Sequence, residues 1–307
     1  MKLDDYIAFN SSFQDKFIYR LGGSTGFFSE YNNMVLAMHY CMVNHYQFVL
    51  ESEGANFLLS EGWNDFFLPF CKEVRGKWLR KFNYRIKPTY KNKWEWFNFN
   101  VYKRLHPHYS YMYMLFNTVR GQDVNRTYTI EPVGLDGTLL ENCSEIHKMI
   151  WRYNPSVKKD ISSLIASLGI PSNHAGIHIR QGDKYEEAML YDPDNYIHHL
   201  QRYTDERNVF ILTDDFRVIT KLRTNYPDYQ FFTLCQPDER GYSLSKLLNS
   251  PKEEQRKALL RLFASMDVLE DSIIFVGTYS ANPGMNMGFR LDKGSIKCID
   301  FDVWQLW

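Results

Sequence analysis

The sequence of 307 residues has no excess of charge of either sign, because 36 lysines and arginines balance 36 aspartates and glutamates. A nucleic-acid-binding protein normally carries a basic excess, so the composition argues against nucleic acid as a partner. Long hydrophobic runs are also missing. No segment approaches the roughly 20 apolar residues that span a bilayer, and the N-terminus, MKLDDYIAFN, has no apolar run of signal-peptide length. We therefore expect a soluble, cytoplasmic protein without a membrane span.

Cysteine is scarce and scattered. The five cysteines are an odd number, and none of them forms a Cys-x-x-Cys pair; they are Cys41, Cys71, Cys143, Cys235 and Cys298. This pattern suggests neither a disulfide framework nor a zinc site, and it is typical of reduced thiols in a cytosolic protein. The sequence also lacks the Gly-x-Gly-x-x-Gly spacing of dinucleotide-binding oxidoreductases, since the loop at 21–26 reads LGGSTG.

The most informative segment is His174–Lys184, which reads HAGIHIRQGDK. Its apolar part predicts a short buried strand that ends in the polar run beginning at Arg180. Ligands of α/β proteins bind at the carboxyl ends of the strands, and an arginine there can form paired hydrogen bonds to two phosphate oxygens. The segment therefore favours an anion-binding site, with a solvated cluster of surface ion pairs as the alternative.

The second half of the chain alternates predicted strands and helices. Strands are expected at 174–180, 208–213, 229–234, 272–276 and 296–299, and helices at 157–168, 194–203, 216–225 and 252–269. Such alternation predicts an α/β fold with a doubly wound parallel sheet. Asn154-Pro155 lies near the expected boundary between an N-terminal domain, 1–156, and a C-terminal domain, 157–307.

The first half is less regular. A glycine loop ending at Gly26 precedes a predicted helix at 29–43, with Ser29 as a plausible N-cap, and a strand is expected at 46–50. The loop is either an anion cradle in front of a helix or a plain turn. The segment Trp94–Phe99 (WEWFNF) alternates apolar and polar residues, which predicts a half-buried strand or a sugar-binding platform.

Four segments, in order, resemble the α-1,6-fucosyltransferases and the related rhizobial nodulation fucosyltransferases. His178, Arg180, Asp183 and Lys184 match the pattern H-x-R-x-x-D-K. The other matches are GFFSE at 26–30 followed by FVLES at 48–52, LTDDFRVITKLRTNYPDYQF at 212–231, and FVGTYSAN at 275–282.

The resemblance implies the GT-B architecture of two facing Rossmann-like domains. The C-terminal domain would hold a nucleotide sugar, and the N-terminal domain would shape the acceptor side. Gly26 and Phe27, in the family's glycine loop, would also contact the nucleotide sugar. The family works without a metal, so Arg180 would stabilise the charge that develops on the leaving diphosphate. Two Asp-x-Asp pairs, at 192–194 and 300–302, are weak signals for a metal; the first has the pattern of a helix cap.

The resemblance also assigns roles to other residues. Glu187 aligns with the catalytic base if the loop after Lys184 is one residue shorter, and Glu186 is a close rival. Lys184 would relay the proton or hold the base, and Asp183 would orient a neighbouring cation. The second diphosphate contact would come from hydroxyls and free N–H groups at a helix N-terminus; its residues are Thr278, Tyr279, Ser280, Ala281 and Asn282.

For the nucleotide base, the resemblance points to Asp267 as the guanine contact, though only with a two-residue deletion. His178 would stack on the base, or it is a core histidine. Asp214 and Asp215 match the family's paired aspartates, and they either support Arg180 or Lys184 or cap the next helix.

The chain departs from the family at two positions. Gln181 replaces a second arginine, which together with the uncertain Asp267 weakens the assignment of GDP-fucose, and Ala281 replaces a serine, which removes one hydroxyl from the turn. The sequence thus predicts an inverting glycosyltransferase that uses GDP-fucose and a glycan acceptor, without a cofactor. A UDP-sugar such as UDP-xylose is the alternative donor, and a non-catalytic glycan-binding or nucleotide-binding module is the alternative class. Because the membrane anchor of the animal enzymes is missing, a bacterial or viral setting is expected; the oligomeric state stays open.

Overall fold

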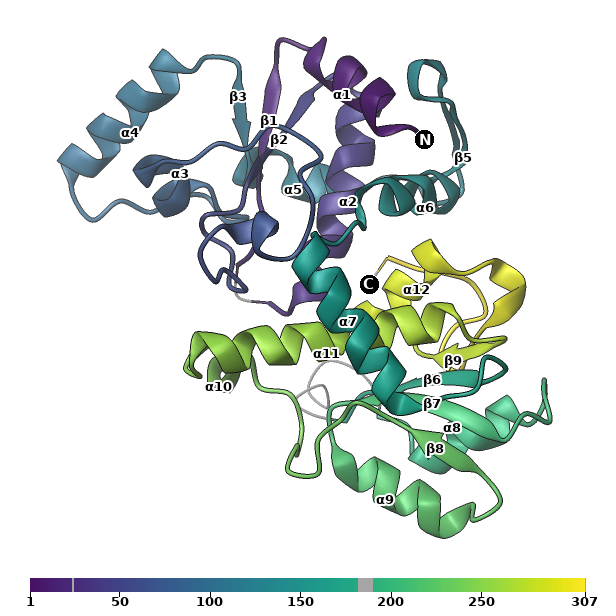
Figure 1. Cartoon of the computed structure of the whole chain (residues 1–307). Helices are drawn as coiled ribbons and strands as arrows, with labels where there is room; N and C mark the ends of the chain where they lie inside the picture. Colours follow the sequence, from purple (N-terminus) through teal and green to yellow (C-terminus); the bar gives the residue numbers. More distant parts are fainter. Residues whose placement is uncertain (24, 182–189, 307) are drawn as a thin grey trace. The chain divides into compact units, whose positions relative to one another are not determined.

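A computed structural model describes residues 1–23, 25–181 and 190–306 of the chain. The chain divides into two compact units, Met1–Asn154 and Pro155–Trp307 (Figure 1). The boundary expected from the sequence, between residues 156 and 157, lies two residues further along. No helix in the described ranges is both long and apolar enough to cross a bilayer.

The first unit is built around a parallel sheet of three strands. Its order is β2-β1-β3, formed by β1 (Lys16–Arg20), β2 (Gln47–Glu51) and β3 (Tyr109–Tyr111). A two-stranded antiparallel sheet pairs β4 (Thr127–Ile130) with β5 (Leu135–Thr138). The helices are α1 (Leu3–Ser11), α2 (Phe27–Val43), η1 (Gly62–Asp65), α3 (Lys77–Phe82), α4 (Lys93–Leu105), α5 (Met112–Arg120), η2 (Glu131–Val133) and α6 (Leu139–Ile150).

Helix α2 begins two residues earlier than the sequence predicts. Its N-cap is Gly26, in an extended conformation, and not Ser29. The earlier start buries Phe27 and Phe28 against a cluster of aromatic rings that includes Trp151. Burial of two large aromatic side chains outweighs the benefit of a serine cap, which is worth about 1 kcal/mol. In the preceding loop, Gly22 has a φ of +97°, and a Cβ there would lie 2.4 Å from Ala55 Cα, so only glycine fits.

The segment around Trp94 is helix α4, so the prediction of a half-buried strand is wrong. Asn92 caps the helix, because its side chain accepts a hydrogen bond from the Glu95 N–H at 2.9 Å. In return, Glu95 accepts one from the Lys91 N–H at 3.0 Å. This arrangement is close to a capping box, and it fixes a helical start in spite of the alternating pattern that follows.

The second unit has a parallel sheet of five strands in the order β10-β9-β6-β7-β8. The strands are β6 (Ala175–Ile179), β7 (Asn208–Thr213), β8 (Gln230–Phe232), β9 (Phe275–Gly277) and β10 (Ile296–Cys298). The helices are α7 (Pro155–Leu168), α8 (Pro193–Leu200), α9 (Phe216–Asn225), α10 (Leu244–Leu248), α11 (Lys252–Glu270) and α12 (Asn282–Arg290), with a short turn η4 (Lys293–Ser295). The prediction of an α/β fold with a doubly wound parallel sheet is confirmed.

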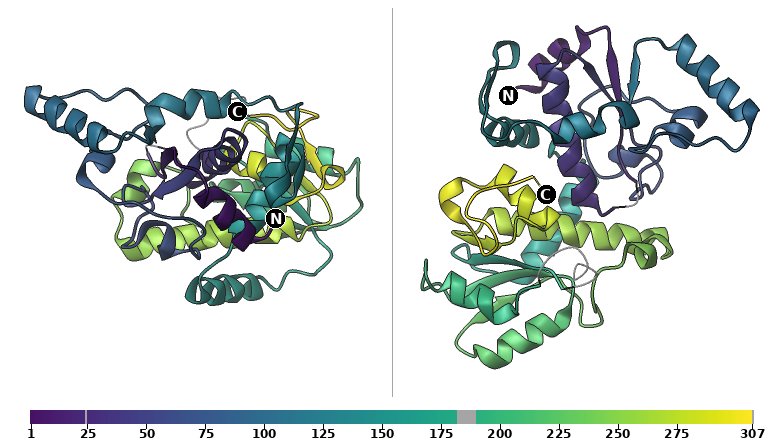
Figure 2. Two further views of the ribbon diagram at one scale, coloured as in Figure 1. Left: turned by 90° about the horizontal axis from the view of Figure 1, so that it is seen from above. Right: turned by 180° about the vertical axis from the view of Figure 1, so that it is seen from behind.

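The two faces of this sheet are covered by different helices, as the views in Figures 1 and 2 show. On one face, alternate residues of β6 and β7, such as Ile177 and Ile211, pack with α8 and α9 around Ile197 and Ile219. On the other face, Gly176 lies against α11, where a Cβ would meet Leu269 at 2.8 Å. Every residue of β6 is buried, as is expected of a strand in a parallel sheet that helices cover on both faces.

The strand order contains one reversal. From β6 the chain moves outward through β7 and β8, and then returns to β9, which pairs with the other side of β6. Ligands of open parallel sheets bind outside the carboxyl ends of the strands at such a switch point. The carboxyl ends of β6 and β9 therefore define where a site is expected.

Candidate functional site

The residues at the switch point are those that the sequence singles out. Arg180 directly follows β6, and Thr278 directly follows β9. The register that pairs Ile177 with Val276 brings these two strand ends to the same edge of the sheet. Asp214 follows β7, the neighbour of β6 on the other side. The fold thus brings an arginine, a hydroxyl-bearing turn and a carboxylate to one edge.

Asp214 fixes the position of Arg180. The Nε of Arg180 lies 3.2 Å from Oδ2 of Asp214, and both side chains are mostly but not fully buried. The guanidinium also lies over the ring of Tyr242, 5.3 Å from its centroid. A carboxylate on one edge and an aromatic ring beneath restrict the arginine, so less conformational entropy is lost when it binds an anion.

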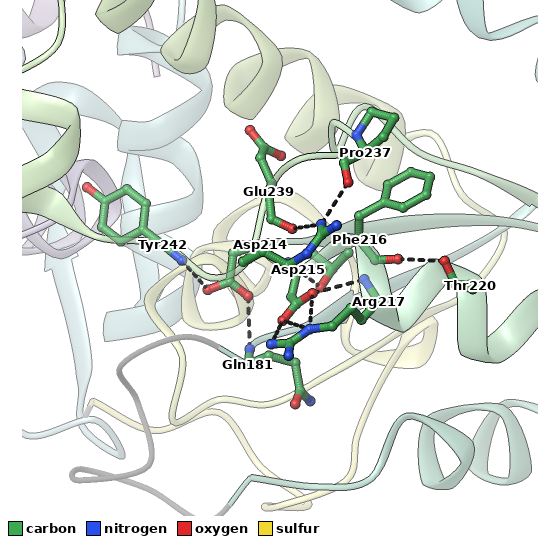
Figure 3. A network of polar contacts seen from close by, with 11 residues as sticks. Gln181, Asp214, Asp215, Phe216, Arg217, Thr220, Pro237, Glu239 and Tyr242 are labelled. Carbon is green, nitrogen blue, oxygen red and sulfur yellow. Dashed lines mark hydrogen bonds and ion pairs between the residues drawn. The ribbon is translucent and has the colours of Figure 1, made fainter.

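The same carboxylate joins three segments of the chain. It accepts hydrogen bonds from the backbone N–H of Gln181 at 2.9 Å and of Tyr242 at 3.0 Å (Figure 3). The Gly241 N–H donates to the Asp214 carbonyl oxygen at 2.7 Å. Of the two roles considered for Asp214, the geometry therefore favours support of Arg180. Tyr242 was missed by sequence reasoning, because it lies in a loop whose position depends on these tertiary contacts.

Asp215 has the capping role that was considered for it. Its side chain accepts a hydrogen bond from the Arg217 N–H at 2.9 Å at the start of α9. The Arg217 side chain pairs with the same carboxylate at 2.5 Å, and this arginine is 72% exposed. The ion pair holds the pKa of Asp215 below its usual range, chiefly through the hydrogen bonds from Arg217.

His178 lies within the sheet, and its side chain is almost fully buried. Burial first, and the nearby positive charge of Arg180 second, lower the pKa of the imidazole to about 4, although Asp214 opposes the change. The ring is therefore neutral at physiological pH. Its Nδ1 has no hydrogen-bond partner among the described residues. Stacking of His178 on a nucleotide base stays a prediction.

The turn after β9 leads into α12, as the position of Pro283 predicts. Helix and turn are closely packed, because a Cβ on Gly284 would lie 2.1 Å from the Thr278 carbonyl oxygen. Thr278, Ser280 and Ala281 are all nearly buried. The Ala281 N–H donates to the Thr278 carbonyl at 3.3 Å. The turn is thus a rigid structure that carries two hydroxyls next to the switch point.

Two more N–H groups in this turn, besides that of Ala281, already have acceptors. Tyr279 N–H donates to Oδ1 of Asp300 at 2.9 Å, and Ser280 N–H donates to Oδ2 of Asp300 at 2.9 Å. The expectation that these N–H groups are free for a diphosphate is therefore wrong. Asp300 was considered only as part of a weak metal motif. Its place two residues after the end of β10, the strand next to β9, is the signal that could have revealed this role.

The remaining aspartates of the two Asp-x-Asp pairs have no common role. Asp192 caps α8 through a hydrogen bond from the Asp194 N–H at 2.9 Å, as its pattern predicts, and it also pairs with Lys221. Asp302 is exposed.

Asp267, the predicted guanine contact, lies on α11 and accepts a hydrogen bond from Arg290 of α12 at 3.2 Å. Its contact with guanine stays a prediction.

Six other residues that the sequence predicts for the site are not placed at these strand ends by the structure. Asp183, Lys184, Glu186 and Glu187 lie outside the described residues, so their roles remain expectations. Gly26 and Phe27 belong to the first unit, where Gly26 is the N-cap of α2. The Phe27 side chain is part of the hydrophobic core, with its ring 5.0 Å from that of Phe57.

Comparison with known proteins identifies the family. Residues 31–239 match the family model for the N- and catalytic domains of α-(1,6)-fucosyltransferase. The chain belongs to the α-(1,6)-fucosyltransferase family. A curated relative, the α-(1,6)-fucosyltransferase of Drosophila melanogaster, is 29% identical over 93 residues, which are 27% of this chain and 15% of that protein. The chain thus matches only a small part of this relative's length.

Solved structures of fucosyltransferases share the fold of this family member. NodZ α-1,6-fucosyltransferase, from a crystal soaked with GDP-fucose, aligns with a TM-score of 0.53 and 14% identity over 94% of this chain and 96% of that one. NodZ from Bradyrhizobium aligns with a TM-score of 0.51 at the same identity and coverage. Arabidopsis thaliana FUT1 in complex with GDP gives a TM-score of 0.50 and 8% identity, over 93% of this chain and 70% of that one.

Proposed function

We propose that the protein is an inverting, metal-independent fucosyltransferase that moves L-fucose from GDP-fucose onto a glycan hydroxyl. The observation that carries the proposal is the position of Arg180, which Asp214 fixes at the switch point of the sheet in a chain of this family. NodZ, which has a similar fold, was crystallised and soaked with GDP-fucose. The second unit would bind the donor, and the first unit would shape the acceptor side.

The reaction would be a single displacement. The acceptor oxygen forms a bond to C1 of fucose while the bond from C1 to the diphosphate oxygen breaks, so the configuration at C1 inverts. The electron pair of the breaking bond goes to the diphosphate of GDP. The acceptor proton goes to a carboxylate, for which Glu187 is the candidate and Glu186 the rival. Arg180 stabilises the negative charge on the leaving diphosphate, because a preorganised cation in a partly buried site interacts more strongly than one in water.

The hydroxyls of Thr278 and Ser280 would provide the second contact to the diphosphate. Both residues follow β9, whose end lies beside that of β6. The N-terminus of α12, which begins at Asn282, would add to this contact through its helix dipole, since anions are favoured at helix N-termini. The Tyr279 ring is buried, and the hydrogen bonds to Asp300 give this residue a structural part in the turn.

Selective binding of GDP is the first expected result. At about a hundred times its Kd, a nucleotide that binds only the folded protein adds about 2.7 kcal/mol of stability, so we expect GDP to raise the Tm by about 5 to 10 °C. UDP and UDP-xylose should have a much smaller effect. The measurement is a thermal-shift panel with EDTA present, repeated with Mn²⁺.

The panel separates the two donors. A rise in Tm caused by UDP and not by GDP would show that this protein uses a UDP-sugar as its donor. Gln181, which stands where the family has a second arginine, is the residue that points to this alternative. A shift that requires Mn²⁺ would contradict the metal-independent mechanism. If GDP binds but no fucose is transferred to any glycan acceptor, the protein is a binding module.

The proposed base gives a second prediction. Glu187→Gln is expected to lower kcat by about 10²- to 10⁴-fold, because general base catalysis contributes on that scale, while leaving the Kd for GDP unchanged. The matched control is Glu186→Gln, for which we expect near wild-type turnover. Single-turnover transfer and GDP titration measure the two quantities. The reverse pattern would make Glu186 the base.

A further inference from the structure

The segment Arg75–Leu105 carries a strong positive charge, although the net charge of the whole chain is zero. It contains ten lysines and arginines and one acidic residue, Glu95, although the whole chain has equal numbers of basic and acidic residues. Glu95 is itself paired with Lys81 at 2.5 Å. Lys87, Lys93 and Arg104 make no ion pair with any residue in the described ranges. This part of the first unit is therefore strongly basic.

Helix α4 within this segment exposes large apolar side chains. Its one buried residue is Phe99, which packs with Leu79 and Phe82 of α3. In Figures 1 and 2 the helix projects from the sheet of the first unit. The exposed side chains are Trp94 (74% exposed), Phe97 (52%), Val101 (40%) and Leu105 (72%).

These four residues form one stripe. At 3.6 residues per turn, their spacing of three, four and four places them within about a quarter of the helix circumference. Lys93 and Arg104 border the stripe on one side by the same geometry. The loop before the helix exposes Ile86, which is 80% exposed, next to Lys87. A stripe of apolar side chains with a basic border is the pattern of a helix that lies in the interface of a membrane.

We propose that α4 and the loop before it dock the protein on an anionic lipid surface. The basic residues would be attracted to negatively charged headgroups. The aromatic and aliphatic stripe would enter the boundary between headgroups and acyl chains. A soluble polyanion would satisfy the basic side chains but would leave Val101 and Leu105 in water, so lipid fits both properties of the surface. This association is peripheral, and it does not depend on the proposed transfer reaction.

Vesicle binding tests the proposal. The full chain should sediment with vesicles of phosphatidylcholine mixed with phosphatidylglycerol, and not with phosphatidylcholine alone. Lys93→Gln/Arg104→Gln should weaken the partition about 25-fold, since each basic residue near an anionic surface contributes roughly fivefold. Phe97→Ser/Leu105→Ser should weaken it at least about tenfold, because the buried apolar area is lost.

The control variant removes the same number of positive charges from a different part of the chain. Lys158 and Lys159 are exposed on α7 of the second unit, and Lys158→Gln/Lys159→Gln should change the partition less than about twofold. All the substituted residues are exposed or nearly so, and unchanged melting curves will show that the variants fold. Equal binding by the α4 variants and this control would overturn the proposal. The proposal would also be overturned if soluble polyphosphate competed with the vesicles and its binding were unaffected by Phe97→Ser/Leu105→Ser. That result would make the surface a binding site for polyanions.

Discussion

Arg180→Ala is expected to lower kcat/KM for fucosyl transfer by about a hundredfold or more, the usual scale for loss of a group that stabilises developing charge. Arg180 is the cation that the fold places at the switch point, and Asp214 holds it at 3.2 Å. Steady-state transfer from GDP-fucose measures the effect. Arg180→Lys should recover only part of the activity, because an ammonium cannot form the paired hydrogen bonds of a guanidinium.

The matched control for this prediction is Arg217→Ala. Arg217 belongs to the same network of polar contacts, but it pairs with Asp215 and is largely exposed (Figure 3). Its loss should leave turnover within about twofold, since exposed ion pairs contribute little. Asp214 keeps its hydrogen bonds from Gln181 and Tyr242 in the Arg180→Ala variant, so the fold should persist. Near wild-type turnover by folded Arg180→Ala would remove Arg180 from the mechanism.

Asp300→Ala is expected to lower both the stability and the affinity for GDP. The substitution leaves the N–H groups of Tyr279 and Ser280 without their acceptor, at a cost of about 1–3 kcal/mol each. We therefore expect the free energy of unfolding to fall by about 2–6 kcal/mol. The turn beside Arg180 should lose its fixed geometry, which weakens GDP binding. Urea unfolding and GDP titration measure the two effects.

Asp302→Ala separates this structural role from a metal site. Asp302 is exposed, and it completes the Asp-x-Asp pattern with Asp300. A metal site would require both carboxylates, so both substitutions would abolish a metal-dependent activity. If Asp300 positions the turn, Asp302→Ala should retain stability and GDP affinity within about twofold. Equal losses in the two variants would contradict the positioning role.

The elements of the second unit are those that the sequence predicts best. Strand β7 and helix α9 have the expected bounds, Asn208–Thr213 and Phe216–Asn225. An apolar run followed by an aspartate cap and a helical period leaves little choice, because local propensity and burial agree there. The start of α7 and the end of β6 differ from the expected bounds by one or two residues, which is the ordinary uncertainty of element ends.

The prediction for α4 failed because two patterns compete in the same residues. WEWFNF alternates as a strand would, but Trp94 and Trp96 are both exposed, so the alternation does not reflect burial. The stronger local signal was the pair Asn92 and Glu95, whose spacing is that of a helix N-terminus. The exposed apolar stripe could not be deduced until the helix was known.

The sequence predicted only the part of the candidate site that lies at the end of a single strand. Arg180 could be selected from its own segment, since it directly follows an apolar strand, where ligands of α/β proteins bind. The partner loop with Tyr242 and the carboxylate of Asp300 depend on which strands become neighbours. That order is a tertiary property, and it is not encoded in any local spacing.

The pairing of β6 with β9 has a consequence for how the proposed donor site forms during folding. Gly176 pairs with Phe275, so about a hundred residues of chain must close into a loop before this contact exists. Local units such as β7 with α9 can form much earlier, because contacts close in sequence cost little chain entropy. We therefore expect Arg180 and the turn after β9 to come together late, so that the proposed anion-binding edge of the sheet is among the last parts of the unit to be completed.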